Sequence, residues 1–401
     1  MSVMIHATGN GKILTDCMTL FLCGDVMTGR GIDQVLPHPG DPHIHEPYLY
    51  NAKKYVEIAE EANGPIPGPV DFSYIWGDAL DELKRVSPDV RIINLETSIT
   101  TSNDYWQGKG IHYRMHPGNI PCISAAEIDC CVVANNHVLD WGYKGLAETL
   151  KVLRDAGLKT AGAGDNTEEA ETPAMMEVSG KGRVVVFAFG ASSSGIPHKW
   201  KATADKPGVN LLPDFSVKTI NQISKGILAV KRTGDVVVAS IHWGTNWGYE
   251  IPPEHIQFAH ELIDSAGADI VHGRSSHHAR GIEVYNDRPI IYGCGDFIND
   301  YEGIGGYEEY RSDLALMYFV RVEVATGKLV ALEMAPMQIM HFRSNRVSDD
   351  DLHWLRDRLN REYSRFEGRV EITKVKTLAF HWRAIALAAR GQKCHPFLPI
   401  D

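Results

Sequence analysis

The chain has 401 residues, of which 44% are hydrophobic and 23% are charged, and its formal net charge is −11. This composition is ordinary for a globular protein and excludes a disordered or fibrous chain. The acidic balance argues against nucleic-acid binding, which needs a basic surface to contact phosphates. We therefore expect a folded protein that does not bind nucleic acid.

No stretch of the sequence has the run of about 18 apolar residues that a membrane-spanning anchor needs. Residues 1–16 lack a basic region followed by an apolar one, which argues against a secretory signal. The seven cysteines are scattered and form no CxxC pair, as is usual for structural thiols in a reducing compartment. These features predict a cytoplasmic protein without a membrane anchor, and they leave its oligomeric state open.

Short apolar runs rich in Val and Ile alternate with helical faces along most of the chain. Such runs are typical of buried strands, and they lie at residues 19–23, 90–93, 130–133, 184–189, 236–241, 270–271 and 289–292. Between them, apolar residues at helical spacing predict helices around residues 146–153 and 258–263. The alternation of strands and helices predicts an α/β layered domain.

Two stretches interrupt this alternation of strands and helices, and the sequence pattern changes near the C-terminal end of the chain. Residues 37–69 predict a long loop with one helix near 52–62, and residues 192–213 predict a second long connection. Ser348 can cap a helix with a leucine-rich face, and a strand-like run follows that helix. We therefore predict a catalytic domain over 15–345 and a C-terminal helix–strand appendage over 346–401.

Polar residues follow the ends of five predicted strands. They are Gly24-Asp25, Asn94-Leu95-Glu96, Asn135-Asn136-His137 with Asp140 following, His242-Trp243-Gly244, and the segment 273–278. Because the carboxyl ends of strands form one edge of an open α/β sheet, we expect these side chains to meet. Carboxylates, amide oxygens and imidazoles together suit Mn, Fe or Zn. The sequence therefore predicts a site for one or two divalent metal ions, which can activate a water molecule when they lie about 3.5–4 Å apart.

The order GD, NLE, NNHxxD, HWG and GxxxHH resembles the capsule-synthesis, or poly-γ-glutamate synthesis, CapA family, which is similar to the calcineurin-like metallophosphatases. The resemblance covers residues 19–300, and its most specific parts are ANNHVLDWG (134–142) and the segment 242–297. It implies an α/β, calcineurin-like metallophosphatase fold with a central β-sandwich flanked by helices in four layers (αββα). It also implies a metal site at the strand ends.

The resemblance further implies roles for individual residues. The implied metal ligands are Asp25, Glu96, Asn136, His242 and His277. The implied general acid or base is His137, and Asp140 and His278 are further catalytic candidates.

Two motifs depart from the superfamily pattern. Met27 stands where the DxH motif has its histidine, and a thioether is a poor ligand for a hard ion. Ser275 stands where the GHxH motif has its first histidine, two residues before His277. His278 and His272 are the candidates to replace that histidine; otherwise one metal position is weak or empty. His272 ends an apolar run, which favours a core histidine with satisfied hydrogen bonds.

A second group of residues is a candidate for substrate recognition. It consists of His112, Arg114, Trp243, Asn246, Trp247 and Arg274. Arginine can grip a carboxylate or phosphate with two hydrogen bonds, and tryptophan can form an apolar wall. In the alternative interpretation the tryptophans pack their own loop and the arginines pair with the surplus of acids.

These features predict a metal-dependent enzyme that acts on a peptide or amide-linked substrate. Its simplest form is a hydrolase in which metal-activated water attacks and His137 protonates the leaving group. The resemblance suggests a substrate of the poly-γ-glutamate type. One alternative is a metal-dependent peptide epimerase, in which histidines remove and return the proton on Cα. Another is a non-catalytic accessory protein of polymer synthesis.

Overall fold

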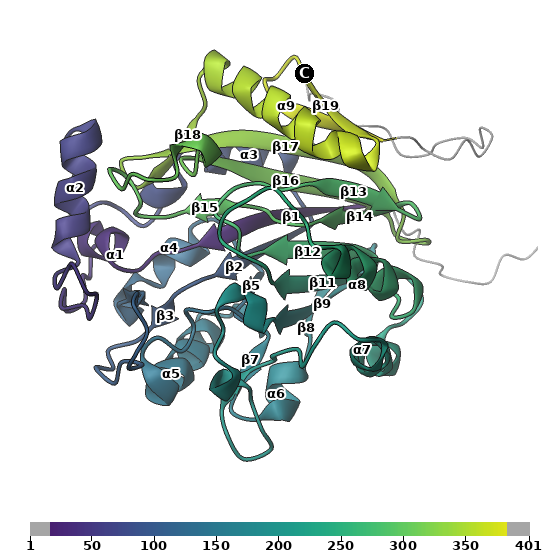
Figure 1. Cartoon of the computed structure of the whole chain (residues 1–401), viewed down its shortest axis with the longest axis horizontal. Coiled ribbons are helices and arrows are strands. Elements are labelled where there is room, and N and C mark those ends of the chain that lie inside the picture. The colour runs from purple at the N-terminus through teal and green to yellow at the C-terminus, as the bar shows by residue number, and fades with distance from the viewer. Residues whose placement is uncertain (1–16, 383–401) are drawn as a thin grey trace, which may run out of the picture.

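Two large β-sheets lie face to face, and helices cover their outer faces, in the computed structural model (Figure 1). The structure describes residues 17–382. The α/β class predicted from the alternation of strands and helices is confirmed. The sequence expectations for residues 1–16 and 383–401 lie outside the described residues.

The first sheet has ten strands and contains the N-terminal strand at its centre. Its order is β19 (Gly368–Ile372), β20 (Leu378–Trp382), β17 (Leu329–Met340), β16 (Leu314–Glu323), β1 (Cys17–Val26), β2 (Val90–Leu95), β5 (Cys130–Val132) and β6 (Lys159–Ala161). In addition, β15 (Asp296–Ile298) pairs with β1, and β18 (Arg343–Arg346) pairs with β17. Strands β15, β1, β2, β5 and β6 run parallel, so their carboxyl ends face the same edge.

The second sheet has six strands in the order β13 (Ile282–Tyr285), β14 (Arg288–Ile291), β12 (Ile270–Arg274), β11 (Asp235–His242), β9 (Gly182–Gly190) and β8 (Ala174–Val178). Its four inner strands are parallel. Two small ribbons complete the β-structure, β3 (Ser98–Ile99) with β4 (Arg114–Met115) and β7 (Ala163–Gly164) with β10 (Gly208–Val209).

The α-helices are α1 (Gly31–Val35), α2 (Lys53–Asn63), α3 (Ala79–Val86), α4 (Pro121–Ser124), α5 (Gly142–Asp155), α6 (Thr167–Glu171), α7 (Val217–Val230), α8 (Pro253–Asp264) and α9 (Asp349–Tyr363). Among the described residues, none of them has the length and apolar character that crossing a bilayer requires.

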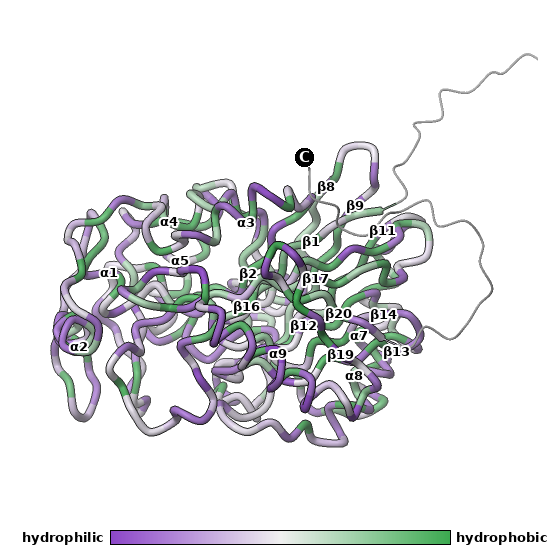
Figure 2. The backbone as a smooth tube through the Cα atoms, turned by 90° about the horizontal axis from the view of Figure 1, so that it is seen from above, coloured by the Kyte–Doolittle hydropathy of each residue, from purple (hydrophilic) through white to green (hydrophobic). Residues whose placement is uncertain are grey.

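Alternation along β1 shows how the layers are held together. Leu20 and Leu22 point toward the second sheet, where they join a core that includes Val184 and Val186 of β9. The intervening residues of β1 point outward into a second core that contains the apolar face of α5, while α7 and α8 pack on the outer face of the second sheet. Each fully buried Leu or Val contributes about 1.5–3 kcal/mol. Figure 2 shows hydrophobic residues concentrated along the central strands and hydrophilic ones along the outer helix α2.

The seven strands predicted from apolar runs are confirmed as β1, β2, β5, β9, β11, β12 and β14, and the predicted helices as α2, α5, α8 and α9. Sequence reasoning missed β16 and β17, which pair with each other in the middle of the first sheet. In β17, Glu333 and Gln338 interrupt the apolar pattern, whereas β16 begins with the continuous apolar run 314–320, which sequence reasoning overlooked.

The region predicted as a C-terminal appendage is described as far as residue 382. It consists of α9 and the hairpin β19–β20, and β20 pairs with β17. These elements therefore extend the first sheet.

Five cysteines, at positions 23, 122, 130, 131 and 294, are buried free thiols, as the sequence suggested. Cys17 differs, because it is disulfide-bonded.

Candidate metal centre

Three buried carboxylates meet at the carboxyl edge of the first sheet. Asp25 lies near the end of β1, Glu96 follows β2, and Asp296 begins β15 in register with Asp25. The glycines before the two aspartates permit this approach. A Cβ on Gly24 would lie 1.6 Å from the carbonyl oxygen of Gly295, so a larger residue there would push β1 and β15 apart.

The three carboxylates and two histidines form two overlapping groups of possible metal ligands. One group is Asp25, Glu96 and His242; the other is Asp25, His277 and Asp296. In each group, one ligand atom from each residue lies within 4.8 Å of the others. Asp25 belongs to both groups, so it would be a ligand of an ion held by either one.

Two asparagines hold the carboxylates in position. The side-chain amide of Asn94 donates to Asp25 Oδ1 at 2.7 Å and to Glu96 Oε2 at 2.8 Å. Asn135 in turn donates to Asn94 Oδ1 at 3.0 Å, and its own Oδ1 accepts from the backbone N–H of His137 at 3.1 Å. This chain of amides orients ligands from β2 and from the segment after β5 without adding charge.

His242 comes from the second sheet and faces the same carboxylates. Its Nε2 lies 3.1 Å from Asn136 Oδ1, and its Nδ1 lies 3.9 Å from Glu96 Oε2. Neither His242 Nδ1 nor Asp25 Oδ2 has a hydrogen-bond partner among residues 17–382, although both atoms are buried. Orphaned buried polar atoms are costly unless another group satisfies them.

The electrostatics of the site also fit a cation. Burial raises the pKa of Asp25 to about 6, and the charge of Asp296 adds to this rise. Burial and the neighbouring carboxylates likewise raise the pKa of Glu96. Burial lowers the pKa of His242, which keeps its imidazole in the neutral form that binds metals. The donor set of carboxylates, imidazoles and the Asn136 amide therefore fits a divalent metal ion.

His137 lies beside this centre, and contacts on the Nδ1 side of its ring fix the orientation of the ring. Its Nδ1–H donates to Asp140 Oδ2 at 2.6 Å, and Lys109 Nζ lies 2.7 Å from the other carboxylate oxygen. The opposite ring nitrogen, Nε2, lies 3.9 Å from Glu96 Oε1. Burial lowers the pKa of His137 to about 4, so the ring is neutral at pH 7 and Nε2 is open to accept a proton.

Arg274, the last residue of β12, is fully buried beneath the carboxylates. It pairs in register with His242 on β11, so both side chains point to the same face of their sheet. None of its three guanidinium nitrogens has a hydrogen-bond partner among the described residues. Burial lowers its pKa to about 10, against the opposing influence of Asp25 and Glu96, so it stays charged at pH 7. Arg274 is thus an internal counter-charge for the acids.

The other residues proposed for substrate binding divide into two sets. His112, Arg114 and Trp243 are buried in packing contacts: Arg114 lies over the ring of Trp141 and donates to backbone carbonyls, and the indole of Trp243 donates to the carbonyl of Tyr292. Asn246 and Trp247 instead line a cavity next to His277. His272 donates or accepts at both ring nitrogens inside the core, as one sequence interpretation held.

The structure places His278 outside both groups of possible ligands. Its ring stacks on Tyr310 with centroids 4.7 Å apart, and its Nε2 has no partner among the described residues.

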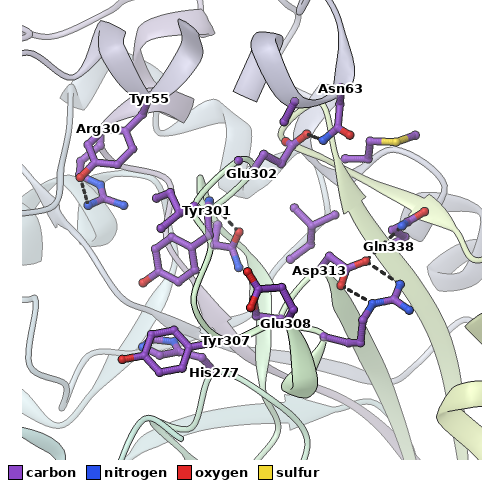
Figure 3. Close-up of a pocket in the computed structure, with 18 of the residues that line it drawn as sticks. Arg30, Tyr55, Asn63, His277, Tyr301, Glu302, Tyr307, Glu308, Asp313 and Gln338 are labelled. Carbon is purple, nitrogen blue, oxygen red and sulfur yellow. Dashed lines mark hydrogen bonds and ion pairs between the residues drawn. The ribbon is translucent and has the colours of Figure 1, made fainter. Parts of the chain in front are cut away.

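The cavity has a volume of about 670 Å³ and reaches the metal centre at His277 (Figure 3). Its other walls come from Arg30, which precedes α1, from α2, from the loop after β15 and from the end of β17. Figure 3 shows His277 and Tyr307 at one end and Asp313 with Gln338 toward another. An opening of this size beside the acids admits part of a chain-like substrate.

Sequence reasoning missed Asp296 and Asn94 as parts of this centre. A signal for Asp296 was present, because Gly295-Asp296 follows the apolar run 289–292 just as Gly24-Asp25 follows the first strand. No comparable signal marks the role of Asn94, which depends on contacts between β1 and β2.

We expect the metal-free protein to lose stability as the pH rises past the folded-state pKa of Asp25. An ordinary aspartate has a pKa of 3.8, whereas folding raises that of Asp25 to about 6. The folded state therefore binds more protons between these values, and the free energy of unfolding falls as the pH rises through this window. A pKa difference of about 2 corresponds to about 3 kcal/mol. Urea unfolding in EDTA at several pH values measures this loss.

The control for this prediction is Asp25→Asn, which removes the titrating group and keeps the shape of the side chain. Its unfolding free energy in EDTA should decline less between pH 4 and pH 7 than that of the unsubstituted protein, by about 3 kcal/mol. Equal declines in the two proteins would contradict the assignment. Adding a divalent metal at pH 7 should restore stability only in the protein that keeps Asp25.

Comparison with known proteins adds independent information. Residues 19–301 match the family model described as "Bacterial capsule synthesis protein PGA_cap". A "probable polyglutamine synthesis accessory protein" of Mycobacterium tuberculosis is 46% identical over 356 residues, which cover 88% of this chain and 93% of the relative.

Two Bacillus proteins are similar at lower identity. "Capsule biosynthesis protein CapA" of Bacillus anthracis is 25% identical over 80% of this chain and 67% of the relative. "PGA biosynthesis protein CapA" of Bacillus subtilis is 26% identical over 84% of this chain and 76% of the relative.

Proposed function

Since the chain belongs to the bacterial capsule synthesis protein PGA_cap family, the CapA family, we propose that it is a metal-dependent enzyme that hydrolyses an amide bond in a peptide-like substrate. The fold we assign to it is the calcineurin-like metallophosphatase fold. The observation that carries the proposal is the convergence of Asp25, Glu96 and His242 beside an oriented His137, at a centre that the cavity reaches through His277.

The proposed ligands are Asp25, Glu96, Asn136, His242, His277 and Asp296, with Mn, Zn or Fe as the ion and one or two ions in the site. A divalent ion held there would lower the pKa of a coordinated water and polarise the carbonyl oxygen of the scissile bond. The protein supplies the ligands' geometry through Asn94 and Asn135, which fix the side chains before any ion binds.

His137 is the proposed proton-transfer residue. Its neutral Nε2 accepts the proton of the attacking water, and the same nitrogen then delivers that proton to the leaving nitrogen. Asp140 holds the ring in the orientation that exposes Nε2 and stabilises the imidazolium while it lasts, and Lys109 keeps Asp140 ionised. Arg274 balances the negative charge of Asp25 and Glu96 from below.

The experiment that tests this function measures metal content and amide cleavage together. We expect the purified protein to bind about one to two equivalents of Mn²⁺, Zn²⁺ or Fe²⁺, and the loaded protein to release amines from amide-linked oligomers. The names of the relatives, which refer to polyglutamine and PGA, place oligomers of glutamine and of γ-linked glutamate among the substrates to assay. Less than about half an equivalent of each metal after reconstitution is incompatible with the proposal.

Two other functions use the same residues and are separated by the same assay. Epimerisation draws on His137 from one sheet and His277 from the other, which approach the centre from different sides. In D₂O it would place deuterium on Cα and leave the chain intact, whereas hydrolysis cleaves the chain and keeps the original hydrogen. An accessory role without catalysis, which the name of the M. tuberculosis relative favours, predicts neither product.

A further inference from the structure

The charged side chains that line the cavity beside His277 do not favour the binding of a polyanion. Arg30 is one of its two cationic lining residues, and it is almost completely buried. Its guanidinium donates to Asp300 at 2.5 and 3.1 Å and to Glu46 at 3.1 Å. Two carboxylates thus surround the one positive charge of Arg30. That charge is already balanced and is not available to a ligand.

Arg311 is the second cationic lining residue, and it is neutralised in the same way. Its Nε and Nη2 each lie 2.8 Å from an oxygen of Asp313, and Nη2 also lies 2.8 Å from Asp351. A substrate carboxylate that enters the cavity would therefore meet two arginines, each of which already pairs with two carboxylates of the protein. It would compete with those carboxylates for the arginines, and it would bring a further negative charge.

Two further carboxylates line the cavity without a cationic partner among the described residues. Glu302 is buried and accepts hydrogen bonds from the backbone N–H groups of His341 and Phe342 and from Asn63. Glu308 is exposed, and its carboxylate accepts from the backbone N–H of Gly306. The hydrogen bonds from the backbone lower the pKa of Glu308, which is ionised at pH 7. Away from His277 and the metal centre, the lining of the cavity therefore carries surplus negative charge.

The mouth of the cavity is apolar. Tyr48 is 71% exposed, and Tyr307 and Ile304 are each 49% exposed, although all three line the cavity. Tyr307 also stacks on Trp247 with ring centroids 4.1 Å apart, and the ring of Trp247 lies next to that of His277, with centroids 5.2 Å apart. Exposed apolar groups gathered at an opening are typical of a binding site and not of an inert surface.

We propose that this cavity binds a peptide-like chain through a side chain with an apolar stem and a terminal amine, as in lysine, and that it discriminates against carboxylate side chains such as those of poly-γ-glutamate. The apolar wall contacts the stem, and Glu308 and Glu302 attract the ammonium group. This proposal rests on the proposed amide chemistry at the neighbouring centre, whose substrate class it specifies.

Binding of three blocked peptides of equal length tests the proposal. They share the sequence acetyl-Ala-Xaa-Ala-amide, with Lys, Gln or Glu at Xaa. Calorimetry measures their Kd with the full-length, Mn²⁺-loaded His137→Ala variant, in which turnover is expected to be strongly slowed. We expect the Lys peptide to bind about tenfold more tightly than the Glu peptide, with Gln between them. Raising the salt concentration from about 0.05 M to about 0.5 M should shrink this ratio.

Glu308→Gln should reduce the Lys-to-Glu ratio about threefold, since it removes one exposed charge. The matched control is Glu309→Gln, an equally exposed neighbour that does not line the cavity, and it should leave the ratio unchanged. Equal or tighter binding of the Glu peptide, no measurable binding of any peptide, or equal effects of the two substitutions would overturn the proposal. Because binding is measured without turnover, a protein that binds the Lys peptide but cleaves no amide would refute the proposed function alone.

Discussion

Asp25→Asn is expected to abolish metal binding at the centre. Asp25 is the only residue that belongs to both groups of possible ligands found in the described part of the chain, and the amide that replaces it offers one neutral oxygen in place of two charged ones. Loss of an outer partner of a metal ligand already lowers affinity by about 10–100-fold, so loss of a shared ligand should exceed that range. Metal content after dialysis, measured by mass spectrometry, checks the result.

The matched control for this prediction is Asp33→Asn. Asp33 is as buried as Asp25, but it accepts hydrogen bonds from the backbone of His116 and Gly40 and belongs to neither ligand group. This variant should keep its metal. Retention of a full complement by Asp25→Asn, or equal loss in both variants, would show that Asp25 is not a ligand.

His137→Ala is expected to lower the rate of amide cleavage by about 10²–10⁴-fold, which is the usual contribution of a positioned acid–base group. The protein should still bind its metal, because His137 belongs to neither ligand group. Asp140→Asn should produce a smaller loss, because it leaves the imidazole in place and removes only the group that orients it. Steady-state rates and metal content measured on the same preparations test both expectations.

A suitable control is His260→Ala, which removes a partly exposed histidine that pairs with Glu283 on the outer side of the second sheet. Its rate should match that of the unsubstituted protein. If His137→Ala cleaves amides at the normal rate, proton transfer has been assigned to the wrong residue. If it loses metal as well, its effect on the rate reports on ligation.

The strands that carry the site were predictable because they are buried on both faces. A strand between two other layers has only apolar neighbours, so its sequence becomes a continuous run such as that of β9 or β11. Helices α5 and α8 were predictable for a related reason, since one face of each packs on a sheet and imposes helical spacing. Strand β17 escaped prediction because Glu333 and Gln338 interrupt its apolar pattern, whereas the apolar run 314–320 of β16 was readable in the sequence and was overlooked.

The residues of the centre were predictable to the extent that they lie next to such strands. Asp25, Glu96 and His242 each stand at or just beyond the carboxyl end of a recognisable strand. The order of their motifs along the chain is the order on which the family resemblance rests. Asp296 stands at the start of β15, a strand of three residues, which is too short to show a pattern. The pairing of β15 with β1 brings Asp296 into the metal centre.

The sequence alone determined the α/β class, the strands on which the chemistry sits and the types of side chain available for a metal. These properties are local, because they follow from the burial of each segment and from the residues that adjoin it. Only the tertiary structure decided which polar groups are already partnered. It pairs Arg30 and Arg311 with carboxylates, buries Arg114 in packing, and leaves Glu308 in the cavity without a cationic partner among the described residues. Charge pairing depends on distances between segments far apart in the chain, so no local pattern records it.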